Sequence, residues 1–462
     1  SGRGIFRLAS VFARAEYSYD TKYLLSVIVR RDATSRFGPD YRFGYFPSVA
    51  MGWVLSQEPF LQDVEQLDFL KLRASYGETG NDKIGDFRYL SALNGEAEYV
   101  FDGNRLDMSG QAIGAIPNPA IQWERNTQFN IGLDASFWGE KLSLTADYFV
   151  KESNDLLLVV PVSGLTGAAG PGASAPVANA GSIRNTGLEL QLNYSDQIGK
   201  SFTFDIGVNG TKLKNETTAL ADGVSFISGG AFGIGNLPPT RWETGMPIGY
   251  FFGLKTDGIF QSQAELESHA RQQNASVGDL TYLYLNKAGV IDHTVRTFIG
   301  NPIPEYVFGM SISARYKNLD FSAFAEAQYG VDLIRNYERN LPLTNKTAYY
   351  AERWYGPGTS NDFPKNSIGA NDNDLFSDFW IEDGSYLRIK NVQLGYSLPK
   401  QWLGNSGLQQ VRLYASVNNI FTFTRYSGYD PNISSGDPLA SGIDIGFYPQ
   451  ARTYISGLKV TF

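Results

Sequence analysis

The amino-acid sequence predicts an all-β fold, a transmembrane antiparallel β-barrel with long extracellular loops. Three observations support this prediction. Segments in which apolar and polar side chains alternate recur through the 462 residues. Short and long connections alternate between these segments, as they do in outer-membrane barrels. Aromatic residues make up 14% of the chain and charged residues only 19%, a balance typical of a wall with aromatic belts and a polar lumen.

The carboxy-terminal segment, residues 449–462, shows the alternation clearly. Tyr454, Leu458 and Phe462 fall on one face, whereas Thr453 and Lys459 fall on the other. A period of two is the repeat of a β-strand, in which neighbouring side chains point to opposite faces of the sheet. This strand is therefore expected to be apolar on one side and polar on the other.

Twelve further segments carry the same pattern, which gives thirteen predicted strands. In the fourth of them, Leu70, Leu72 and Ala74 oppose Lys71 and Arg73. The thirteen segments cover residues 7–19, 22–31, 47–56, 68–77, 123–138, 141–151, 183–195, 201–213, 306–317, 319–330, 385–397, 410–420 and 449–462.

The lengths of the connections predict the orientation of the chain. Connections after odd-numbered strands are short or modest, such as Asp20-Thr21 and Gly139-Glu140. Those after even-numbered strands run from about 15 to about 90 residues, the length expected of external loops. The last strand is then expected to end in the periplasm. Within the longest connection, residues 262–273 are predicted to form a short surface helix.

The start of the chain indicates that it is part of something longer. Residues 1–10 contain no apolar run of the kind found in a signal peptide, so Ser1 is not expected to be the start of the gene product. Single-chain bacterial barrels have even strand numbers, and an open edge in lipid leaves backbone groups without partners. Thirteen strands therefore predict that the amino-terminal portion of the same polypeptide is present as a second piece.

Several classes of function are excluded or disfavoured by composition. The net charge of −8 argues against nucleic acid as a partner, and the absence of cysteine excludes disulfides and thiolate metal sites. No apolar run approaches the roughly 20 residues of a spanning helix. The motifs of metalloproteases, serine hydrolases and nucleotide-binding loops are absent. We therefore predict a protein that is no enzyme and needs no metal or cofactor.

Seven segments resemble the SusC-like, RagA-type branch of TonB-dependent outer-membrane transporters. They occur in the expected order along the whole chain, which makes the resemblance specific. The segments are RRDATSRFGPDYRFGYFPSVAMGW (30–53), WERNTQFNIGLD (123–134), NAGSIRNTGLELQLNY (179–194), IGNPIPEYVFGMSISARY (299–316), EDGSYLRIKNVQLGYSLP (382–399), NNIFTFTRYSGYDP (418–431) and YPQARTYISGLKVTF (448–462).

The resemblance implies a 22-stranded barrel in the outer membrane of a Gram-negative bacterium. Residues 1–462 would form its carboxy-terminal part, and the plug domain and first strands would lie outside this chain. The implied function is active import of an oligomeric glycan or peptide, with a SusD-like lid lipoprotein as partner and energy from the TonB complex acting through the plug. Residues 279–296 depart from a calcium-loop pattern of the family, because Tyr284 and Ala288 replace oxygen ligands. We expect no calcium there.

Candidate site residues fall into three groups. The first group contains polar residues that are expected to face the lumen, where they would form a polar wall, make salt bridges to the plug or act in transport. They are Arg14, Glu16, Lys71, Arg73, Glu189, Glu326 and Lys459. The second group contains loop residues that are expected to contact cargo or the lid; the alternative is that they pack within the loops. They are Arg241, Trp242, Tyr250, Phe251, Tyr349, Tyr350, Trp354 and Tyr355. Phe462 resembles a terminal aromatic assembly signal, with a place in the aromatic belt as its alternative.

Three other classes of protein remain open. A passive porin would lack a plug and a lid. A surface scaffold or receptor built on the same barrel would lack a functional TonB-contacting segment. A soluble all-β glycan-binding module would be extracted without detergent, but the alternation of short and long connections argues against it.

Overall fold

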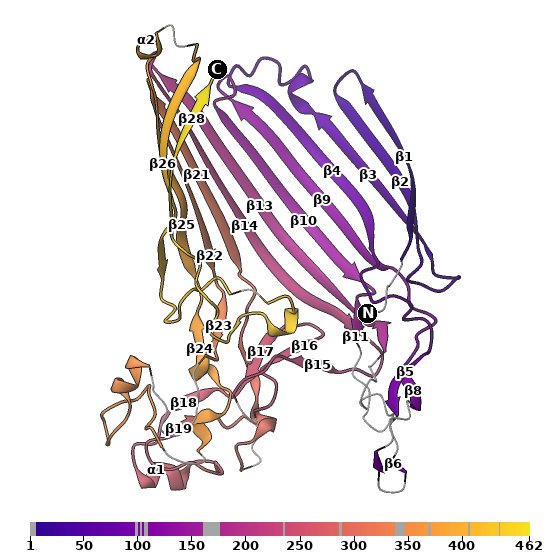
Figure 1. Cartoon of the computed structure of the whole chain (residues 1–462), viewed down its shortest axis with the longest axis vertical. Helices are drawn as coiled ribbons and strands as arrows, with labels where there is room; N and C mark the ends of the chain where they lie inside the picture. Colours follow the sequence, from indigo (N-terminus) through magenta and orange to yellow (C-terminus); the bar gives the residue numbers. More distant parts are fainter. Residues whose placement is uncertain are drawn as a thin grey trace. The chain divides into compact units, whose positions relative to one another are not determined.

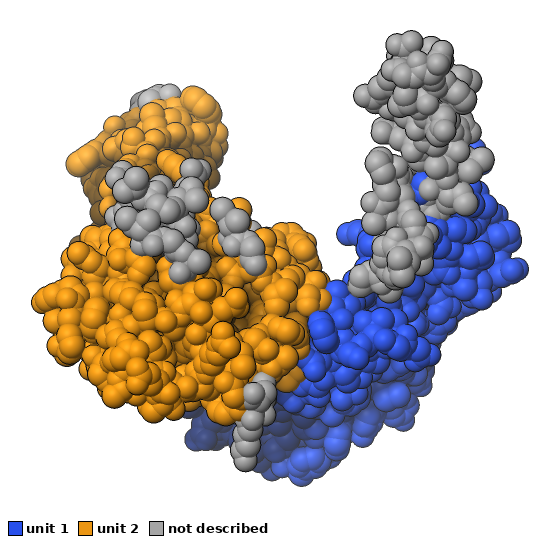
Figure 2. Space-filling model, turned by 90° about the horizontal axis from the view of Figure 1, so that it is seen from below, with its two compact units in different colours: residues 1–194, 213–227, 243–245 blue, residues 195–212, 228–242, 246–462 orange. Residues whose placement is uncertain are grey.

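A computed structural model describes residues 6–97, 100–101, 104–105, 110–159, 176–233, 236–285, 289–337, 347–367, 371–404, 407–433 and 435–462. Strands and loops make up nearly all of them (Figure 1). The chain divides into two compact units, coloured blue and orange in Figure 2. Unit 1 comprises residues 1–194, 213–227 and 243–245, and unit 2 comprises residues 195–212, 228–242 and 246–462.

One large sheet of thirteen strands contains every predicted strand, in the predicted order. Its neighbours follow the order of the chain, and the pairings within each unit are antiparallel. The strands are β1 (Leu8–Tyr19), β2 (Tyr23–Thr34), β3 (Phe43–Val54), β4 (Leu67–Asn81), β9 (Glu124–Phe137), β10 (Leu142–Asn154), β13 (Gly181–Ile198), β14 (Phe202–Leu220), β21 (Tyr306–Tyr316), β22 (Leu319–Tyr329), β25 (Tyr386–Ser397), β26 (Gln410–Thr424) and β28 (Thr453–Thr461).

Several strands extend further than the sequence pattern indicates. β14 runs on to Leu220, although the predicted segment stops at residue 213, and β3 begins at Phe43, four residues before the prediction. Residues 214–218 of β14 read KNETT, which are polar on both faces. Side chains alternate only in the part of a strand that has one apolar face and one polar face. Backbone hydrogen bonding between strands continues beyond that part.

Tight turns join strands at the end with short connections. Asp20 and Thr21 have φ values of 50° and 53°, and the Lys22 amide donates to the Tyr19 carbonyl at 3.0 Å. Two consecutive central residues with positive φ define a type I′ turn, whose twist matches that of the flanking strands. This hairpin fixes the register of β1 on β2, in which Ala15 pairs with Val27.

Each unit leaves large apolar side chains exposed on one face of its sheet. In unit 1 the pairing aligns Leu25, Met51, Ala74, Ile131, Tyr148 and Leu188 in one row across six strands. In unit 2 it aligns Ile206, Ile312, Ala323, Val392, Val417 and Tyr454, of which Tyr454 is exposed and the others are partly exposed. Soluble proteins rarely expose contiguous apolar surface of this extent. We call this face the apolar face and the opposite one the polar face.

Smaller elements lie in the long connections. In unit 1, β5 (Ala92–Ala97) pairs with β8 (Gly110–Ala115), β6 (Val100–Phe101) with β7 (Asn104–Arg105), and β11 (Leu157–Val159) with β12 (Val177–Asn179). The longest connection contains two small sheets. One joins β15 (Phe226–Gly229), β16 (Thr240–Glu243), β17 (Tyr250–Gly253) and β20 (Thr297–Gly300), and the other joins β18 (Thr256–Ile259) and β19 (Leu280–Tyr282).

A third small sheet in unit 2 joins β23 (Asp332–Arg335), β24 (Ile381–Asp383) and β27 (Ile443–Asp444). The described residues contain two α-helices, α1 (Gln263–Ser268), which confirms the predicted surface helix at a shorter length, and α2 (Lys400–Leu403). Short 3-10 turns cover Leu55–Gln57, His293–Val295, Ala348–Glu352, Asp372–Asp374, Asp378–Trp380 and Pro438–Ala440. Within the described residues, no helix is long and apolar enough to cross a membrane.

The buried cores lie in the loops, where side chains pack against one another as in a soluble protein. One cluster in unit 2 contains Phe232, Phe251, Ile334, Phe376, Trp380 and Ile443, and a second contains Leu254, Ile259, Leu280, Tyr282, Ile291 and Val295. We call residues 228–242, 246–304, 331–384 and 436–446 of unit 2 the loop layer. In unit 1, Trp123 packs edge-on against Phe37 and Phe46, with ring centroids 5.5 Å apart in both pairs.

Candidate cargo-binding loops

Three of the aromatic residues predicted to contact cargo are buried inside the loop layer. Trp242 lies on β16, and Tyr250 and Phe251 lie on β17. Phe251 is 0% exposed and packs in the cluster with Ile334 and Trp380. These three side chains therefore lie where the alternative interpretation, packing within the loops, would place them. A direct contact with cargo stays a prediction.

The other predicted loop residues are less deeply placed. The Arg241 guanidinium stacks over the Phe252 ring at 3.4 Å. Tyr350 packs edge-on against Phe363, with ring centroids 4.8 Å apart, and the Trp354 indole donates to Gln261 Oε1 at 3.0 Å. Tyr355 is 76% exposed. The side chain of Tyr349 lies outside the described part of the chain.

The last long loop, residues 425–452, exposes apolar side chains that the sequence analysis did not single out. Tyr448 is 91% exposed, and Tyr429 and Ile445 are also exposed. Tyr429 and Tyr448 lie in two of the segments that carry the family resemblance. Nothing in the spacing of these residues, however, distinguishes an exposed aromatic ring from a buried one. Exposed aromatic rings on a fixed backbone suit contact with sugar faces or with peptide side chains.

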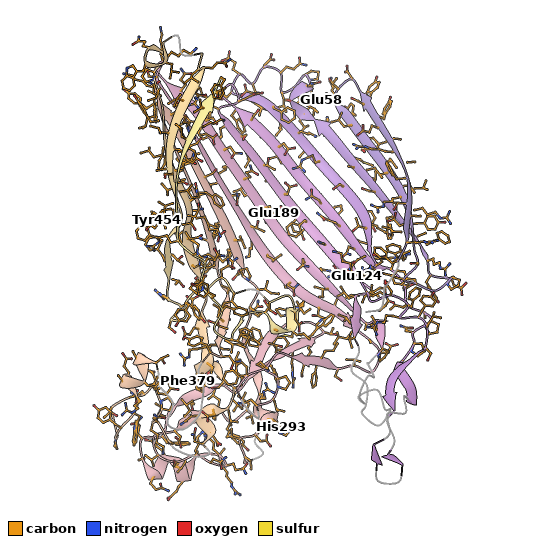
Figure 3. The ribbon with its side chains drawn as sticks, viewed as in Figure 1. Glu58, Glu124, Glu189, His293, Phe379 and Tyr454 are labelled. Atoms are coloured by element: carbon orange, nitrogen blue, oxygen red, sulfur yellow. The ribbon has the colours of Figure 1, made fainter. Side chains whose placement is uncertain are left out.

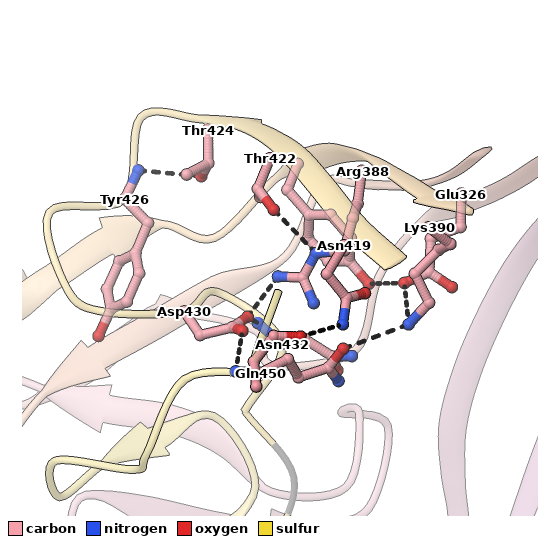
Figure 4. Close-up of polar contacts among 12 residues, drawn as sticks. Glu326, Arg388, Lys390, Asn419, Thr422, Thr424, Tyr426, Asp430, Asn432 and Gln450 are labelled. Carbon is pink, nitrogen blue, oxygen red and sulfur yellow. Dashed lines mark hydrogen bonds and ion pairs between the residues drawn. The ribbon is translucent and has the colours of Figure 1, made fainter. Parts of the chain in front are cut away.

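A buried ion pair fixes this loop to the large sheet (Figure 4). Arg388 of β25 is 2% exposed and donates from Nη2 to Asp430 and from Nε to Thr422 Oγ1, the latter at 2.9 Å. Asp430 also accepts the backbone amides of Asn432 at 2.9 Å and Gln450 at 3.1 Å. One carboxylate thus holds both ends of the loop.

A β-bulge beside this ion pair adds a second group of contacts (Figure 4). The pairing of β25 shifts between Ile389 and Asn391, and Lys390 reaches Glu326 at 3.2 Å. Across from it, Asn419 has a φ of 53° and donates to the Ala451 carbonyl at 3.0 Å. Glu326, predicted to face the lumen, therefore pairs with a neighbouring strand in this structure.

The anchor predicts how the loop responds to acid. Although burial opposes it, donation from Arg388 and from the Asn432 and Gln450 amides holds the pKa of Asp430 below its usual range. The stabilisation is then fully present above the unfolded-state pKa, about 3.9, and is lost as pH falls through the folded-state value. We expect the difference in thermal midpoint between the native protein and Asp430→Asn to shrink below about pH 4. A difference that grows in acid would contradict this assignment.

Asp444 forms a second fixed point in the same loop. Its carboxylate accepts the Tyr426 hydroxyl at 2.6 Å and the backbone amides of Gly446 at 2.8 Å and Phe447 at 3.1 Å. β27, which contains Asp444, pairs in parallel with β23. The exposed stretch from Ile445 to Tyr448 therefore begins on a well-held backbone.

The residues predicted to face the lumen lie on the polar face. Arg73, Gly132, Asp147 and Glu189 form one row across β4, β9, β10 and β13, and Glu189 is labelled on β13 in Figure 3. Arg73 Nε donates to Asp134 at 2.6 Å, and its Nη2 spans β9 to reach Asp147 at 3.0 Å. A side-chain carbon at Gly132 would meet the guanidinium at 2.8 Å, so glycine permits this crossing.

A similar arrangement occurs in unit 2. Arg412 of β26 pairs with Asp320 of β22 across Gly395 of β25. Lys459 lies opposite Arg412 in the pairing of β26 with β28. In unit 1, Arg14 pairs with its neighbour Glu16, and Lys71 lies opposite Asp134. The polar face is therefore lined by charged side chains, several of them joined across strands.

Residues 279–296, expected to bind no calcium, use their carboxylates within the fold. Asp279 accepts the Ser276 amide at 2.8 Å and the Asn373 side chain at 2.8 Å, and Asp292 accepts the Thr294 amide at 2.8 Å. Asn286 lies outside the described residues. The absence of calcium remains a prediction.

Comparisons with known proteins place the chain in a family. The sequence profile of a family described as "TonB dependent receptor-like, beta-barrel" matches residues 2–420. The TonB-dependent receptor P3 of Formosa agariphila is 32% identical over 98% of this chain and 45% of that protein. The TonB-dependent receptor SusC of Bacteroides thetaiotaomicron is 30% identical over 98% of this chain and 44% of that protein.

A solved structure gives the same result. One described as the RagAB peptide transporter has a TM-score of 0.83 and 26% identity, and the match covers 99% of this chain and 47% of that one. The chain thus spans less than half the length of these relatives. Because the family profile covers most of the chain, the chain belongs to the TonB-dependent receptor-like β-barrel family, and its large sheet is a SusC- and RagA-like barrel wall.

Proposed function

We propose that this chain is the carboxy-terminal barrel portion of an outer-membrane importer of an oligomeric nutrient. Its relatives, each about twice its length, include a receptor named SusC and a peptide transporter, which supports a TonB-dependent uptake role. The plug and the remaining strands would come from the amino-terminal portion of the same polypeptide. The apolar face would contact outer-membrane lipid, and the polar face would line the lumen or meet the plug.

The observation that carries this proposal is the anchored loop layer beside a wall with an exposed apolar face. The loop layer has its own hydrophobic clusters, and the buried pair of Arg388 with Asp430 fixes the last long loop to β25, so these loops are held in place before cargo arrives. Binding to a preorganised surface loses less conformational entropy than binding to a mobile one. Cargo would be a glycan or a peptide, captured between these loops and a SusD-like lipoprotein on the outer surface.

No covalent chemistry is needed for such a cycle. Capture would come from many loop contacts and from closure of the lid, and release into the lumen would follow displacement of the plug by the TonB complex. Among the predicted contacts, Tyr355 is exposed, as are Tyr429 and Tyr448 of the last loop. These three rings are the first candidates for contact with cargo. Phe462, also exposed, would serve as the assembly signal.

Composition of the purified particle and energy dependence of uptake together test the proposal. Peptide mass spectrometry of the detergent-purified particle should find a plug-bearing amino-terminal segment and a lipoprotein in about equal amount. Uptake of fluorescent glycan or peptide oligomers should stop when the tonB gene is deleted or a protonophore is added. Uptake that continues in both cases would favour a passive porin, and no uptake with an intact plug would favour a surface scaffold.

A further inference from the structure

The loop layer contains a cavity of about 240 Å³ that none of the predicted site residues accounts for. Five separate stretches of unit 2 line it, and they contribute Leu254, Ile291, Arg296, Asp372 and Phe376 among others. His293, labelled in Figure 3, is also part of the lining. Most sites for drug-sized ligands exceed 300 Å³. This cavity therefore suits a smaller group, of the size of one or two amino acids.

One wall of the cavity carries a cation without a counter-ion. Arg296 Nη2 donates to the Pro238 carbonyl at 2.7 Å and to the Phe252 carbonyl, and within the described part of the chain Arg296 forms no ion pair. Burial, with the nearby charge of Arg241, lowers the pKa of Arg296 to about 10. The Arg296 guanidinium also lies over the Phe252 ring, 5.2 Å from its centroid. A partly buried cation held by carbonyl oxygens and a ring, with no carboxylate beside it, is stabilised by a carboxylate that arrives with a ligand.

The lining also carries a carboxylate without a cation. Asp372 is 6% exposed, and it accepts only the backbone amide and the side-chain amide of Asn274, both at 3.3 Å. Burial raises its pKa. No lysine or arginine among the described residues pairs with it. An ammonium group of a ligand would supply the missing ion-pair partner of Asp372, just as a carboxylate of a ligand would supply that of Arg296.

Apolar side chains form the rest of the lining used here. Leu254 and Phe376 are buried in the two hydrophobic clusters and also line the cavity with Ile291. Both Arg296 and Asp372 line the cavity, and among the described residues no ion pair joins them. The lining therefore offers the Arg296 cation, the carboxylates of Asp372 and Asp292, and apolar surface to the same small ligand. Asp292 already accepts the amide and the hydroxyl of Thr294 at 2.8 and 2.6 Å, so Asp372 is the carboxylate open to a ligand cation.

We propose that this cavity binds a short zwitterion of amino-acid or dipeptide size, with its carboxylate at Arg296 and its ammonium group at Asp372. A neutral sugar of the same size would leave both charges without partners, and a buried charge without a partner is costly. Within the proposed function, on which its role in uptake rests, the cavity is a subsite that favours peptide cargo or its end groups over neutral glycan.

Binding to the detergent-purified complex tests this directly. The probes are the dipeptide Ala-Ala, its N-acetyl form, its carboxy-terminal amide and maltose, measured by calorimetry. Each capped dipeptide loses one charge-assisted contact and should bind about 10-fold more weakly or worse, and maltose should not bind at this site. Equal binding of all four probes, or no binding of Ala-Ala, would overturn the proposal.

Variants assign the two ends of the ligand. In Asp372→Asn, the N-acetyl dipeptide and unmodified Ala-Ala should bind with equal affinity. In Arg296→Gln, the carboxy-terminal amide and unmodified Ala-Ala should bind with equal affinity. Asp257→Asn and Arg353→Gln change exposed charges outside the cavity and should leave the preferences intact. The probe comparison on the unaltered protein decides the matter if a variant does not fold.

These measurements are independent of transport. Zwitterion binding without TonB-dependent uptake would refute the proposed function and keep the cavity as a binding site. Normal uptake of labelled oligomers without any zwitterion binding would refute the subsite alone.

Discussion

Replacing Arg388 with alanine is expected to weaken the anchor of the last long loop by about 3–5 kcal/mol, the usual cost of breaking a buried ion pair. The substitution removes the only side-chain cation that pairs with Asp430 among the described residues. Asp430, which is 8% exposed, would keep its full negative charge with two backbone amides as its donors. The loop from Tyr426 to Gln450 should therefore open far more often than in the native protein.

Hydrogen exchange measures this opening at the groups concerned. The amides of Asn432 and Gln450 donate to Asp430 in the native structure, so their exchange should accelerate by two orders of magnitude or more. Lys390→Ala is the matched control. Its ion pair with Glu326 is partly exposed, and such pairs contribute about 1 kcal/mol or less. Equal effects of the two substitutions would show that burial of the Arg388 pair is not what holds the loop.

Removing both partners separates the anchor from the cost of an unpaired charge. In the double variant Arg388→Met and Asp430→Leu, no charge is left buried, and replacing a buried pair by apolar residues is often neutral. Because Asp430→Leu removes the acceptor of the Asn432 and Gln450 amides, the readout here is the amides of Gly446 and Phe447, which donate to Asp444 in the same loop. We expect these two amides to exchange more slowly in the double variant than in Arg388→Ala. Faster exchange in the double variant would mean that the ion pair itself supplies net stability.

The fold of the large sheet was predictable because one physical constraint acts on every strand. A strand between lipid and a polar face must alternate, and a slip of one residue would turn its apolar set inward. That constraint ends where both faces are polar, so the pattern located β14 but not its end at Leu220. Short turns, such as the one at Asp20 and Thr21, then indicate which consecutive strands form hairpins.

The arrangement of the loops was not predictable in the same way. The sequence predicts Trp242 and Phe251 as cargo contacts because flat rings in external loops can stack on sugar faces and grip peptide side chains. A buried ring and an exposed ring, however, can have the same local sequence. Their burial depends on partners such as Ile334 and Trp380, far along the chain. Likewise, Arg388 and Asp430 are 42 residues apart, and no local period connects them.

The family resemblance pointed toward the anchor without explaining it. Arg388, Asp430 and Gln450 each lie in one of the three carboxy-terminal segments that carry the resemblance. The structure joins them through a single carboxylate. The role of these segments follows from that contact: they tie the last loop to the end of the wall, and β28 begins three residues after Gln450.

Replacing Phe251 with alanine should separate loop packing from contact with cargo. Phe251 is fully buried, and truncation of a buried phenylalanine to alanine costs about 3–5 kcal/mol through lost burial and the cavity left behind. We expect the amides of β17 and β23 to lose hydrogen-exchange protection together, because Phe251 packs against Ile334. Cargo binding should then fall as a consequence of the loosened loop layer.

Tyr355→Ala provides the opposite case. Its ring is largely exposed, and substitutions at such positions usually change stability by no more than about 0.5 kcal/mol. A contact with cargo would therefore appear as weaker cargo binding with unchanged exchange in β17 and β23. If Phe251→Ala instead weakens binding while protection in both strands is retained, Phe251 contacts cargo through a loop conformation different from this one, and the buried cluster is not the state that binds.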